Sequence, residues 1–205
     1  MISEMIAQPE AYFRGLLPSR STLLKSMEEE ARREDIPIVG PVVGEMLYVL
    51  ARATGASRIL ELGTASGYSA IFLAEACAVT GGRLTAMELD EVMAQRATMN
   101  LANAGLAQWA EVKCVNALEA IPQMEETFDF IFMDIEKADY LSMLPNCTRM
   151  VRTGGMLVVD NVGFADAAPF NRAINKNSSW RNASLYAFLP EHSPEKDGLC
   201  LAVRV

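Results

Sequence analysis

The sequence has little cysteine, no excess of basic residues and no long hydrophobic run, and each shortage excludes a class of protein. The four cysteines among its 205 residues, Cys77, Cys114, Cys147 and Cys200, are spaced too widely for a short metal-binding motif. They predict the reduced thiols of a cytoplasmic protein. The formal net charge of -8 argues against nucleic acid or anionic membranes as partners, because both are polyanions. Small molecules or other proteins are the expected partners.

Histidine is scarcer still, and targeting signals are lacking. His192 is the sole histidine and lies in the polar stretch EHSPEKD, so we expect a solvated side chain without a catalytic role. No apolar run approaches the length of a membrane-spanning helix, and the first residues lack the basic-then-apolar pattern of a secretion signal. We therefore expect no membrane association.

The pattern of apolar residues predicts one α/β domain over residues 1–205. Residues 1–55 have helix signals, including a Ser/Thr cap before LLKSMEEEARRED and a Pro-to-Gly frame around VVGEMLYVLARAT. Residues 56–205 alternate short strands with helices. The five strands expected to be parallel are RILEL, RLTAMEL, AEVKCV, FDFIFMD and GMLVVD. WRNASLYAFLP and GLCLAVRV have no helix between them and predict a final antiparallel pair. Pro145 predicts a kink or break in the fourth helix.

The first strand runs into ILELGTASGYSA, which predicts a ligand site at the carboxyl end of the sheet. Gly63 and Gly67 allow a tight turn and a close approach of the backbone to a ligand. Their spacing differs from the dinucleotide pattern G-x-G-x-x-G, whereas Glu-x-Gly-x-x-x-Gly, starting at Glu61, is typical of methyltransferases. Glu88 ends the second strand, where a carboxylate can accept both hydroxyls of a ribose. The alternative is a plain strand-to-helix connection beside a solvated carboxylate.

Acidic and amide side chains follow the fourth and fifth strands. Asp134 comes directly after FDFIFM, and Asp160 and Asn161 come after GMLVV, so one strand-helix-strand crossover brings them to the same edge. Their hard oxygen donors suit Mg²⁺. Lys137 lies in the loop just beyond Asp134. The alternative is that these residues only end strands and that Lys137 pairs with a neighbouring acid.

At these motifs the sequence resembles the metal-dependent class I O-methyltransferases that include catechol and caffeoyl-CoA O-methyltransferases. The matching runs are ILELGTASGYSA, LTAMELD, FDFIFMDIEKADY, GGMLVVDN and DGLCLAVRV. The resemblance implies a doubly wound, mostly parallel, seven-stranded Rossmann-like sheet with an antiparallel last strand and N-terminal helices. For the bacterial members it also implies a homodimer.

The resemblance also implies roles for individual residues. Asp134, Asp160 and Asn161 match the ligands of Mg²⁺ or another divalent cation such as Ca²⁺ or Mn²⁺, and Lys137 matches the general base. Glu88 matches the position on the ribose and Ala117 the one beside the adenine. The residues expected around S-adenosylmethionine are Val42, Glu61, Gly63, Thr64, Gly67, Tyr68, Ser69, Glu88, Leu89, Ala117 and Asp134.

The implied reaction is transfer of a methyl group from a sulfonium to a hydroxyl of a small catechol-like acceptor. A dication bound to two adjacent hydroxyls favours the oxyanion of one and fixes its position, and Lys137 takes the proton. The stretch GFADAAPFNRAIN after Asn161 is shorter than in many relatives, which predicts a more open acceptor site. That shortening leaves a second hypothesis, a cofactor-binding protein of the same fold with weak or no turnover. An NAD-dependent oxidoreductase is disfavoured by the glycine spacing.

Overall fold

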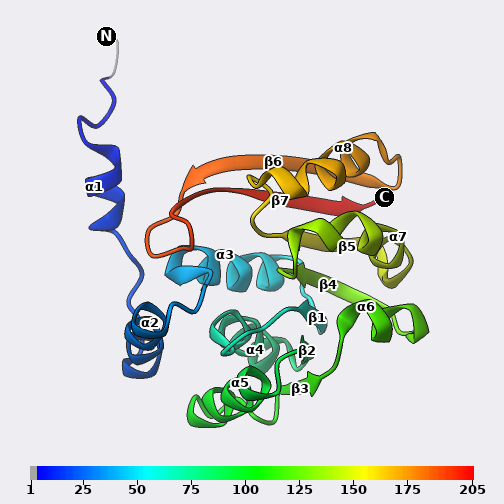
Figure 1. Cartoon of the computed structure of the whole chain (residues 1–205), viewed down its shortest axis with the longest axis horizontal. Helices are drawn as coiled ribbons and strands as arrows, with labels where there is room; N and C mark the ends of the chain where they lie inside the picture. The colour runs from blue at the N-terminus through cyan, green and yellow to red at the C-terminus, as the bar shows by residue number, and fades with distance from the viewer. Residues whose placement is uncertain (1–3) are drawn as a thin grey trace.

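A seven-stranded sheet forms the centre of the computed structural model, which describes residues 4–205 (Figure 1). Its strand order is β3-β2-β1-β4-β5-β7-β6. Strands β1 to β5 are parallel, and β7 is antiparallel to both β5 and β6. The strands are β1 Arg58–Leu62, β2 Arg83–Glu88, β3 Ala110–Cys114, β4 Phe128–Met133, β5 Val151–Val159, β6 Trp180–Phe188 and β7 Lys196–Arg204. The predicted doubly wound, mostly parallel sheet is confirmed.

Helices precede and connect the strands. They are α1 Pro9–Arg14, α2 Thr22–Glu34, α3 Gly40–Ala53, α4 Tyr68–Thr80, α5 Glu91–Asn103, α6 Ala117–Ala120, α7 Tyr140–Met150 and α8 Ala168–Lys176. Short 3-10 turns are η1 Ile121–Gln123, η2 Lys137–Asp139 and η3 Ala165–Ala167. Among residues 4–205, no helix has both the length and the apolar composition needed to span a membrane.

Capping side chains begin several of these helices where the sequence predicts. Ser21 accepts a hydrogen bond from the backbone N–H of Leu24 and so starts α2. Asp90 accepts from the N–H of Met93 and starts α5 in the same way. The predicted cap before LLKSMEEEARRED is therefore confirmed as the start of α2.

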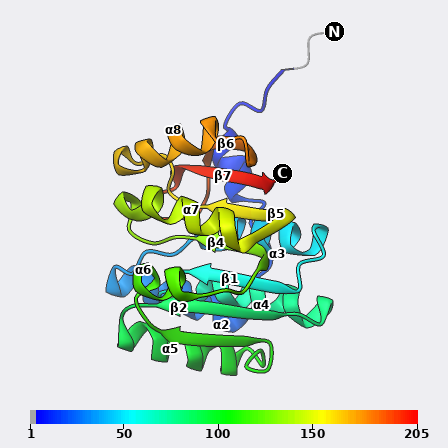
Figure 2. The ribbon, with the colours of Figure 1, turned by 90° about the vertical axis from the view of Figure 1, so that its right-hand side faces the viewer.

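Alternating strand residues divide the core into two halves, one on each face of the sheet. Ile59 packs with one half and its neighbour Leu60 with the other, because successive side chains of a strand point to opposite faces. The first half contains apolar residues of α2, α3, α4 and α5, and the second contains those of α7 and α8. Figure 2 shows the helices on both sides of the sheet. Both faces are thus buried, as a parallel sheet requires.

The carboxyl ends of the central strands meet at one edge of the sheet. The backbone N–H of Asp134, just after β4, donates to the carbonyl of Leu62 at the end of β1 (2.8 Å). The N–H of Asp160, just after β5, donates to the carbonyl of Met133 at the end of β4 (3.1 Å). Strand register therefore fixes both aspartates side by side at this edge.

Proline affects two of the helices differently. The segment NALEAIPQM, residues 116–124, is α-helical only as far as Ala120 and continues as the turn η1, because Pro122 lacks an N–H to donate. Pro145, by contrast, does not break its helix, since α7 runs through it from Tyr140 to Met150. Of the two predicted alternatives, a kink or a break, the break at Pro145 is therefore wrong.

Asp129 joins three strands at the edge opposite the site. Its carboxylate accepts hydrogen bonds from Arg152 Nε (2.6 Å) and from the backbone N–H groups of Ser57 and Arg58 (2.9 and 2.8 Å). Partial burial by itself would raise the pKa of Asp129, but these bonds outweigh it and lower the pKa to about 2.

We predict that Asp129→Asn lowers the free energy of unfolding at pH 7 by about 1–3 kcal/mol, because charge-assisted hydrogen bonds are lost. The lowered pKa means that this stabilisation is present above the usual value of 3.8 and is lost as the pH falls toward 2. The difference between wild type and variant in urea unfolding should accordingly shrink below about pH 4. The exposed Asp166→Asn serves as control, and an Asp129→Asn variant as stable as that control would contradict the assignment.

Candidate active site

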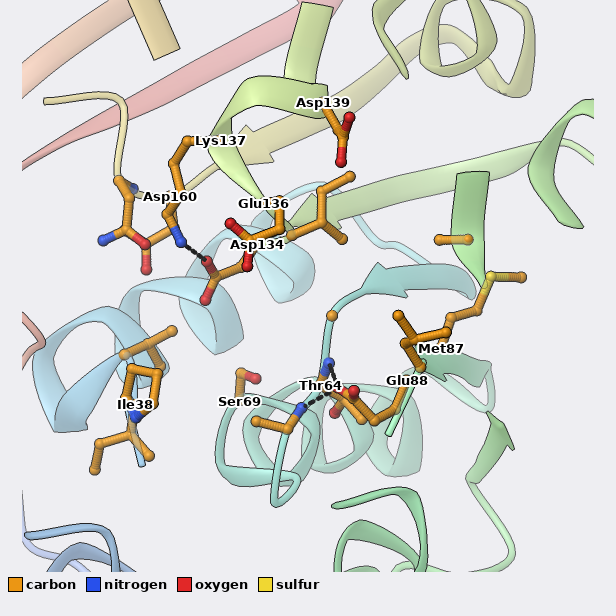
Figure 3. Close-up of a pocket in the computed structure, with 18 of the residues that line it drawn as sticks. Ile38, Thr64, Ser69, Met87, Glu88, Asp134, Glu136, Lys137, Asp139 and Asp160 are labelled. Atoms are coloured by element: carbon orange, nitrogen blue, oxygen red, sulfur yellow. Dashed lines mark hydrogen bonds and ion pairs between the residues drawn. The ribbon is translucent and has the colours of Figure 1, made fainter. Parts of the chain in front are cut away.

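A cavity of about 390 Å³ opens at the carboxyl ends of β1, β2, β4 and β5 (Figure 3). Such a volume lies within the range of small-molecule and cofactor sites. Figure 3 shows Glu88 at one end and the Asp134, Lys137 and Asp160 group at the other. Residues 37–39, between α2 and α3, also line the cavity.

The turn after β1 forms the floor of the cavity and needs glycine at two positions. Gly63 has φ 81° and Gly67 has φ 87°, in the left-handed region that L side chains rarely adopt. A Cβ on Gly63 would collide with the carbonyl oxygen of Asp134, and one on Gly67 would lie 2.9 Å from the Cα of Ala97. The turn therefore packs backbone against backbone between β1 and β4.

Glu88 holds this turn through its carboxylate. Its Oε2 accepts from the N–H groups of Thr64 (3.3 Å) and Ala65 (2.8 Å) (Figure 3). Its Oε1 accepts from the backbone N–H of Asp90 (2.9 Å). Each carboxylate oxygen can accept about two hydrogen bonds. Oε1 therefore keeps capacity for a ligand hydroxyl in the cavity that Glu88 lines.

Glu61 lies wholly buried beneath the turn. Thr64 Oγ1 donates to its Oε2 (2.6 Å), whereas its Oε1 has no hydrogen-bond partner among the described residues. Burial raises the pKa of Glu61 to about 7, and the hydroxyls of Ser69 and Thr64 lower it only in part. An unpartnered carboxylate oxygen at this depth favours a cationic or hydrogen-donating ligand nearby.

At the other end, Lys137 lies beside Asp134. Its Nζ is 3.4 Å from Asp134 Oδ1, and both side chains are about one quarter exposed (Figure 3). Burial, and then repulsion from Asp160, raises the pKa of the Asp134 carboxyl, which the ammonium of Lys137 offsets only in part. The site therefore has two acidic groups whose repulsion a further cation would relieve.

Asn161 presents its amide oxygen to the cavity. Its Nδ2 donates to Asp197 Oδ2 (2.6 Å) and to the carbonyl of Ser193 (3.4 Å). A carboxylate ion only accepts, so the amide nitrogen must face Asp197 and Oδ1 is left on the other side. Asn161 has φ 50°, a conformation that asparagine tolerates better than most residues, and it lines the cavity.

Comparison with known proteins gives the family of this chain. The O-methyltransferase family profile matches residues 19–171, about three quarters of the chain. The chain belongs to this O-methyltransferase family. A catechol O-methyltransferase of Niastella koreensis is 32% identical over 168 residues, which cover 79% of this chain and 76% of the relative.

Solved structures of O-methyltransferases have the same fold. The enzyme from Bacillus cereus in complex with SAH superposes with a TM-score of 0.85 at 27% identity, covering 96% of this chain and 97% of its own. TomG from Streptomyces achromogenes, in complex with SAM, gives 0.85 at 29% identity, covering 98% and 100%. The predicted class, an S-adenosylmethionine-dependent O-methyltransferase of catechol or caffeoyl-CoA type, is thereby confirmed.

Most residues that the sequence predicts around the cofactor line the cavity of this methyltransferase. Those lining it are Gly63, Thr64, Tyr68, Ser69, Glu88, Leu89, Ala117 and Asp134. Glu61 lies below the floor, Gly67 packs on α5, and Val42 lies within α3, so these three are not part of the lining. All four residues predicted for metal binding and proton transfer, Asp134, Lys137, Asp160 and Asn161, line the opposite end.

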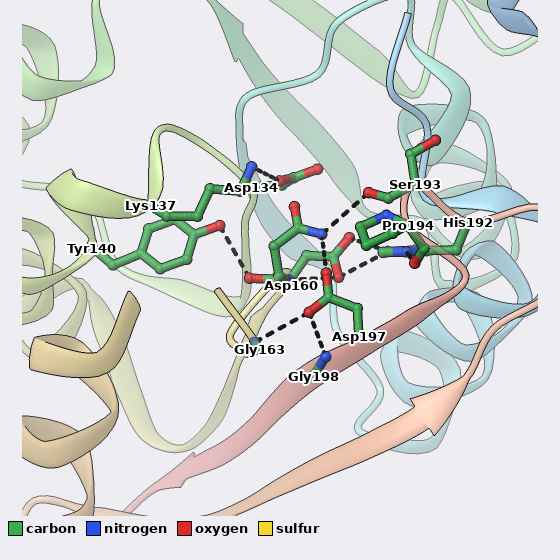
Figure 4. A network of polar contacts seen from close by, with 11 residues as sticks. Asp134, Lys137, Tyr140, Asp160, Gly163, His192, Ser193, Pro194, Asp197 and Gly198 are labelled. Atoms are coloured by element: carbon green, nitrogen blue, oxygen red, sulfur yellow. Dashed lines mark hydrogen bonds and ion pairs between the residues drawn. The ribbon is translucent and has the colours of Figure 1, made fainter. Parts of the chain in front are cut away.

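The prediction of a solvated His192 is wrong. Its side chain is 1% exposed, and Nε2 lies 3.0 and 2.9 Å from the two carboxylate oxygens of Asp160 (Figure 4). Burial by itself would lower the pKa of His192, but the hydrogen bond and charge of Asp160 outweigh it and raise the pKa above 6.5. His192 is therefore buried against Asp160, one of the residues that line the cavity.

Asp197 is a second residue that the sequence analysis missed. It is 2% exposed and accepts from Asn161 Nδ2 and from the N–H groups of Gly163 (3.1 Å) and Gly198 (2.6 Å) (Figure 4). The run DGLCLAVRV contains it, so the resemblance pointed to the segment without giving this residue a role. Its contacts turn the amide of Asn161 toward the cavity.

The donor set fits a hard divalent cation. Asp134, Asp160 and the free Oδ1 of Asn161 offer oxygen atoms only, as Mg²⁺ prefers. Within residues 4–205 no group of three or more His, Cys, Asp or Glu side chains is spaced for metal binding. Asp134, Asp160 and Asn161 do not count as such a group, because only two of them are carboxylates and the third is an amide.

The end of the cavity that contains Asp134 and Asp160 is bounded by segments far apart in sequence. Pro37 and Ile38 line it from one side, and Ser193, in the loop between β6 and β7, lines it from another. Residues 163–175, the stretch expected to leave the site open, are not among the lining residues. This end of the cavity is therefore bordered by the segment before α3 and by the loop between β6 and β7.

We predict that Gly63→Ala destabilises the methyltransferase more than Gly81→Ala. Both positions have left-handed φ, which costs about 1–2 kcal/mol for alanine. Only at Gly63 does the added Cβ also meet backbone, whereas a Cβ on Gly81 meets nothing within 4 Å. Overpacking should add about 1–3 kcal/mol in urea unfolding. Equal losses for the two variants would contradict the close approach of Gly63 to Asp134.

Proposed function

We propose that this enzyme transfers the methyl group of S-adenosylmethionine to one hydroxyl of a small catechol-like acceptor, with a divalent cation and with Lys137 as general base. One observation carries the proposal. Two carboxylates, a free amide oxygen and a lysine ammonium converge at one end of the cavity, opposite the carboxylate of Glu88. The similarity to a catechol O-methyltransferase supports the choice of acceptor class.

The floor and the Glu88 end suit S-adenosylmethionine. The open capacity of Glu88 Oε1 suits a ribose hydroxyl, and Leu89 and Ala117 offer apolar and small side chains for a purine. The unpartnered Oε1 of Glu61 below the turn favours a positively charged ligand above it. These features support a cofactor position at the side of the cavity formed by β1 and β2.

Asp134, Asp160 and Asn161 would hold the cation, which we take as Mg²⁺, with Ca²⁺ and Mn²⁺ as alternatives. When bound, it would supply positive charge that favours ionisation of an acceptor hydroxyl and would fix two adjacent oxygens in place. The same charge offsets the repulsion that raises the pKa of Asp134. Each of the three side chains lines the cavity.

Lys137 is the candidate base because its Nζ lies at the same end of the cavity as Asp134 and Asp160. In the proposed step, the neutral amine of Lys137 accepts the proton of the acceptor hydroxyl as that oxygen bonds to the methyl carbon. The carbon–sulfur bond breaks, and its electron pair stays on sulfur to give S-adenosylhomocysteine. Asp134, 3.4 Å away, holds the protonated ammonium afterwards.

The lining favours a small acceptor without negative charge. Glu136 and Asp139 join the two metal-site aspartates around Lys137, so this end has more acidic than basic groups. Ile38 and Ile135 add apolar surface suitable for an aromatic ring. A neutral or cationic vicinal diphenol therefore suits the site better than a polyanionic substrate.

The proposal is tested by formation of S-adenosylhomocysteine from S-adenosylmethionine with a panel of catechols, in Mg²⁺ and again in EDTA. We expect Mg²⁺-dependent turnover in wild type. Lys137→Ala should lower the rate by about 10²–10⁴-fold without changing calorimetric binding of S-adenosylhomocysteine. Lys137→Arg keeps the charge but has no neutral form, so it should be equally inactive.

The exposed Lys176→Ala is the matched control and should retain full activity. An active Lys137→Arg variant would show that Lys137 is not the general base and that only its positive charge matters. Equal turnover in Mg²⁺ and EDTA would remove the metal. Binding of S-adenosylhomocysteine without turnover on any catechol would favour a cofactor-binding protein or a different acceptor class.

We also propose a homodimer in which α1 covers a second copy of the chain. This helix has no buried residue among those described, and Tyr12, Phe13 and nearby Leu16 are each about half exposed. Figure 1 shows α1 set apart from the sheet. Apolar surface of this kind suits an interface between copies.

Light scattering of wild type should give twice the monomer mass of 22.4 kDa, and Phe13→Asp with Leu16→Asp should give the monomer. Val79→Asp, at an exposed apolar position on α4, is the control. A monomeric wild type would rule out the dimer.

A further inference from the structure

The loop between β6 and β7, residues 189–195, contacts Asp160 and Asn161, the two proposed metal ligands that follow β5. His192 contacts the carboxylate of Asp160, and the carbonyl of Ser193 accepts from Nδ2 of Asn161 (Figure 4). His192 does not line the cavity, whereas Asp160 and Asn161 do. The imidazole therefore lies behind Asp160 and does not touch an acceptor bound in the cavity.

Hydrogen-bond counting shows how His192 constrains Asp160. His192 Nδ1 lies 2.6 Å from the carbonyl of Pro194, which only accepts, so Nδ1 is a donor and is used up. Nε2 faces both oxygens of Asp160, and the N–H of Asn161 donates to Oδ1 as well (2.8 Å). Oδ1 of Asp160 thus faces two N–H groups, those of Asn161 and His192, whereas Oδ2 faces only that of His192. The free lone pair of this carboxylate is on Oδ2.

The loop that carries His192 is itself fixed from several sides. Glu191 pairs with Arg32 of α2 (2.7 Å), and Glu195 pairs with Arg14 at the end of α1 (2.6 Å). The N–H of Ser193 donates to the carbonyl of Ile38 (3.2 Å). His192 therefore cannot simply follow Asp160 if the carboxylate turns.

A close backbone approach adds to this anchoring. Gly40, at the start of α3, has φ 69°, and a Cβ there would lie 2.6 Å from the carbonyl carbon and oxygen of Glu191. The first turn of α3 thus packs directly on the loop backbone. The position of the His192 imidazole is therefore set by the N-terminal helices as well as by β6 and β7, which flank its loop.

We propose that His192 is a positioning residue of the metal site, which holds the Asp160 carboxylate so that Oδ2 is presented to the bound cation. This inference rests on the divalent cation of the proposed function. His192 is not itself a ligand, because it does not line the cavity and its Nε2 faces the carboxylate of Asp160. Residues that orient metal ligands typically change metal affinity 10–100-fold when they are replaced.

The test is calorimetric titration of Mn²⁺ into wild type and two variants. His192→Leu keeps an apolar side chain of similar size but donates nothing, so Mn²⁺ binding should weaken about 10–100-fold. His192→Gln keeps an N–H donor near the place of Nε2 and should recover most of the affinity. Binding of S-adenosylhomocysteine should stay within about twofold in both, because the cofactor end does not contact the loop.

Catalysis gives a second readout. If His192 only orients Asp160, the Mg²⁺ concentration at half-maximal rate should rise in His192→Leu, while the rate at saturating Mg²⁺ stays close to that of wild type. A merely structural role would instead lower the melting temperature and the affinities for Mn²⁺ and S-adenosylhomocysteine together in both variants. That result would overturn the positioning role.

Asp160→Ala separates the two proposals. Wild type that binds Mn²⁺ with loss of binding in Asp160→Ala supports the metal site. If His192→Leu then binds Mn²⁺ as tightly as wild type or more tightly, the contact of His192 with Asp160 does not support metal binding. The positioning role of His192 is then wrong, whereas the proposed metal site stands. Wild type that binds no Mn²⁺ overturns the metal site and the role of His192 with it.

Discussion

The burial of Asp160 is the constraint on which the arrangement of the site depends. Its side chain is 1% exposed, and it ends a strand whose neighbour ends in Asp134. Removing a carboxylate from water costs several kcal/mol unless charged and polar partners replace the water. His192 and the backbone of Asn161 supply those partners behind it, and Lys137 supplies a charge beside Asp134. The other elements of this end of the cavity serve to bring those partners into place.

Local patterns in the sequence were enough to predict the sheet and the position of the site. Alternating strand and helix segments fix a parallel sheet, and the carboxyl ends of its strands must share an edge. The strand order along the sequence is therefore enough to predict that Asp134 and Asp160 lie at the same edge of the sheet. The turn after β1 was predictable for a similar reason, because Gly63 and Gly67 mark a backbone conformation that other residues adopt only with strain.

His192 could not be predicted in the same way, because its surroundings are built from distant segments. EHSPEKD has the composition of a solvated turn, yet Glu191 and Glu195 find their partners in Arg32 and Arg14. Each such exposed pair contributes at most about 1 kcal/mol. These ion pairs add little to the stability of the loop, whereas the close approach of Gly40 and the contact of His192 with Asp160 hold the loop in its position. A single sequence does not reveal which charged residue meets which.

The two ends of the cavity differ in how much chain must be ordered to form them. The Glu88 end comes from consecutive strand-helix units between residues 58 and 117, whose contacts are comparatively local. The other end needs residues 134–161 together with the linker at Ile38 and the last loop, and Arg14 and Glu195 are 181 residues apart. Closing so long a stretch of chain costs entropy that local contacts do not. Freeing the terminal segments would therefore remove the support of Asp160 before it disturbs the turn after β1.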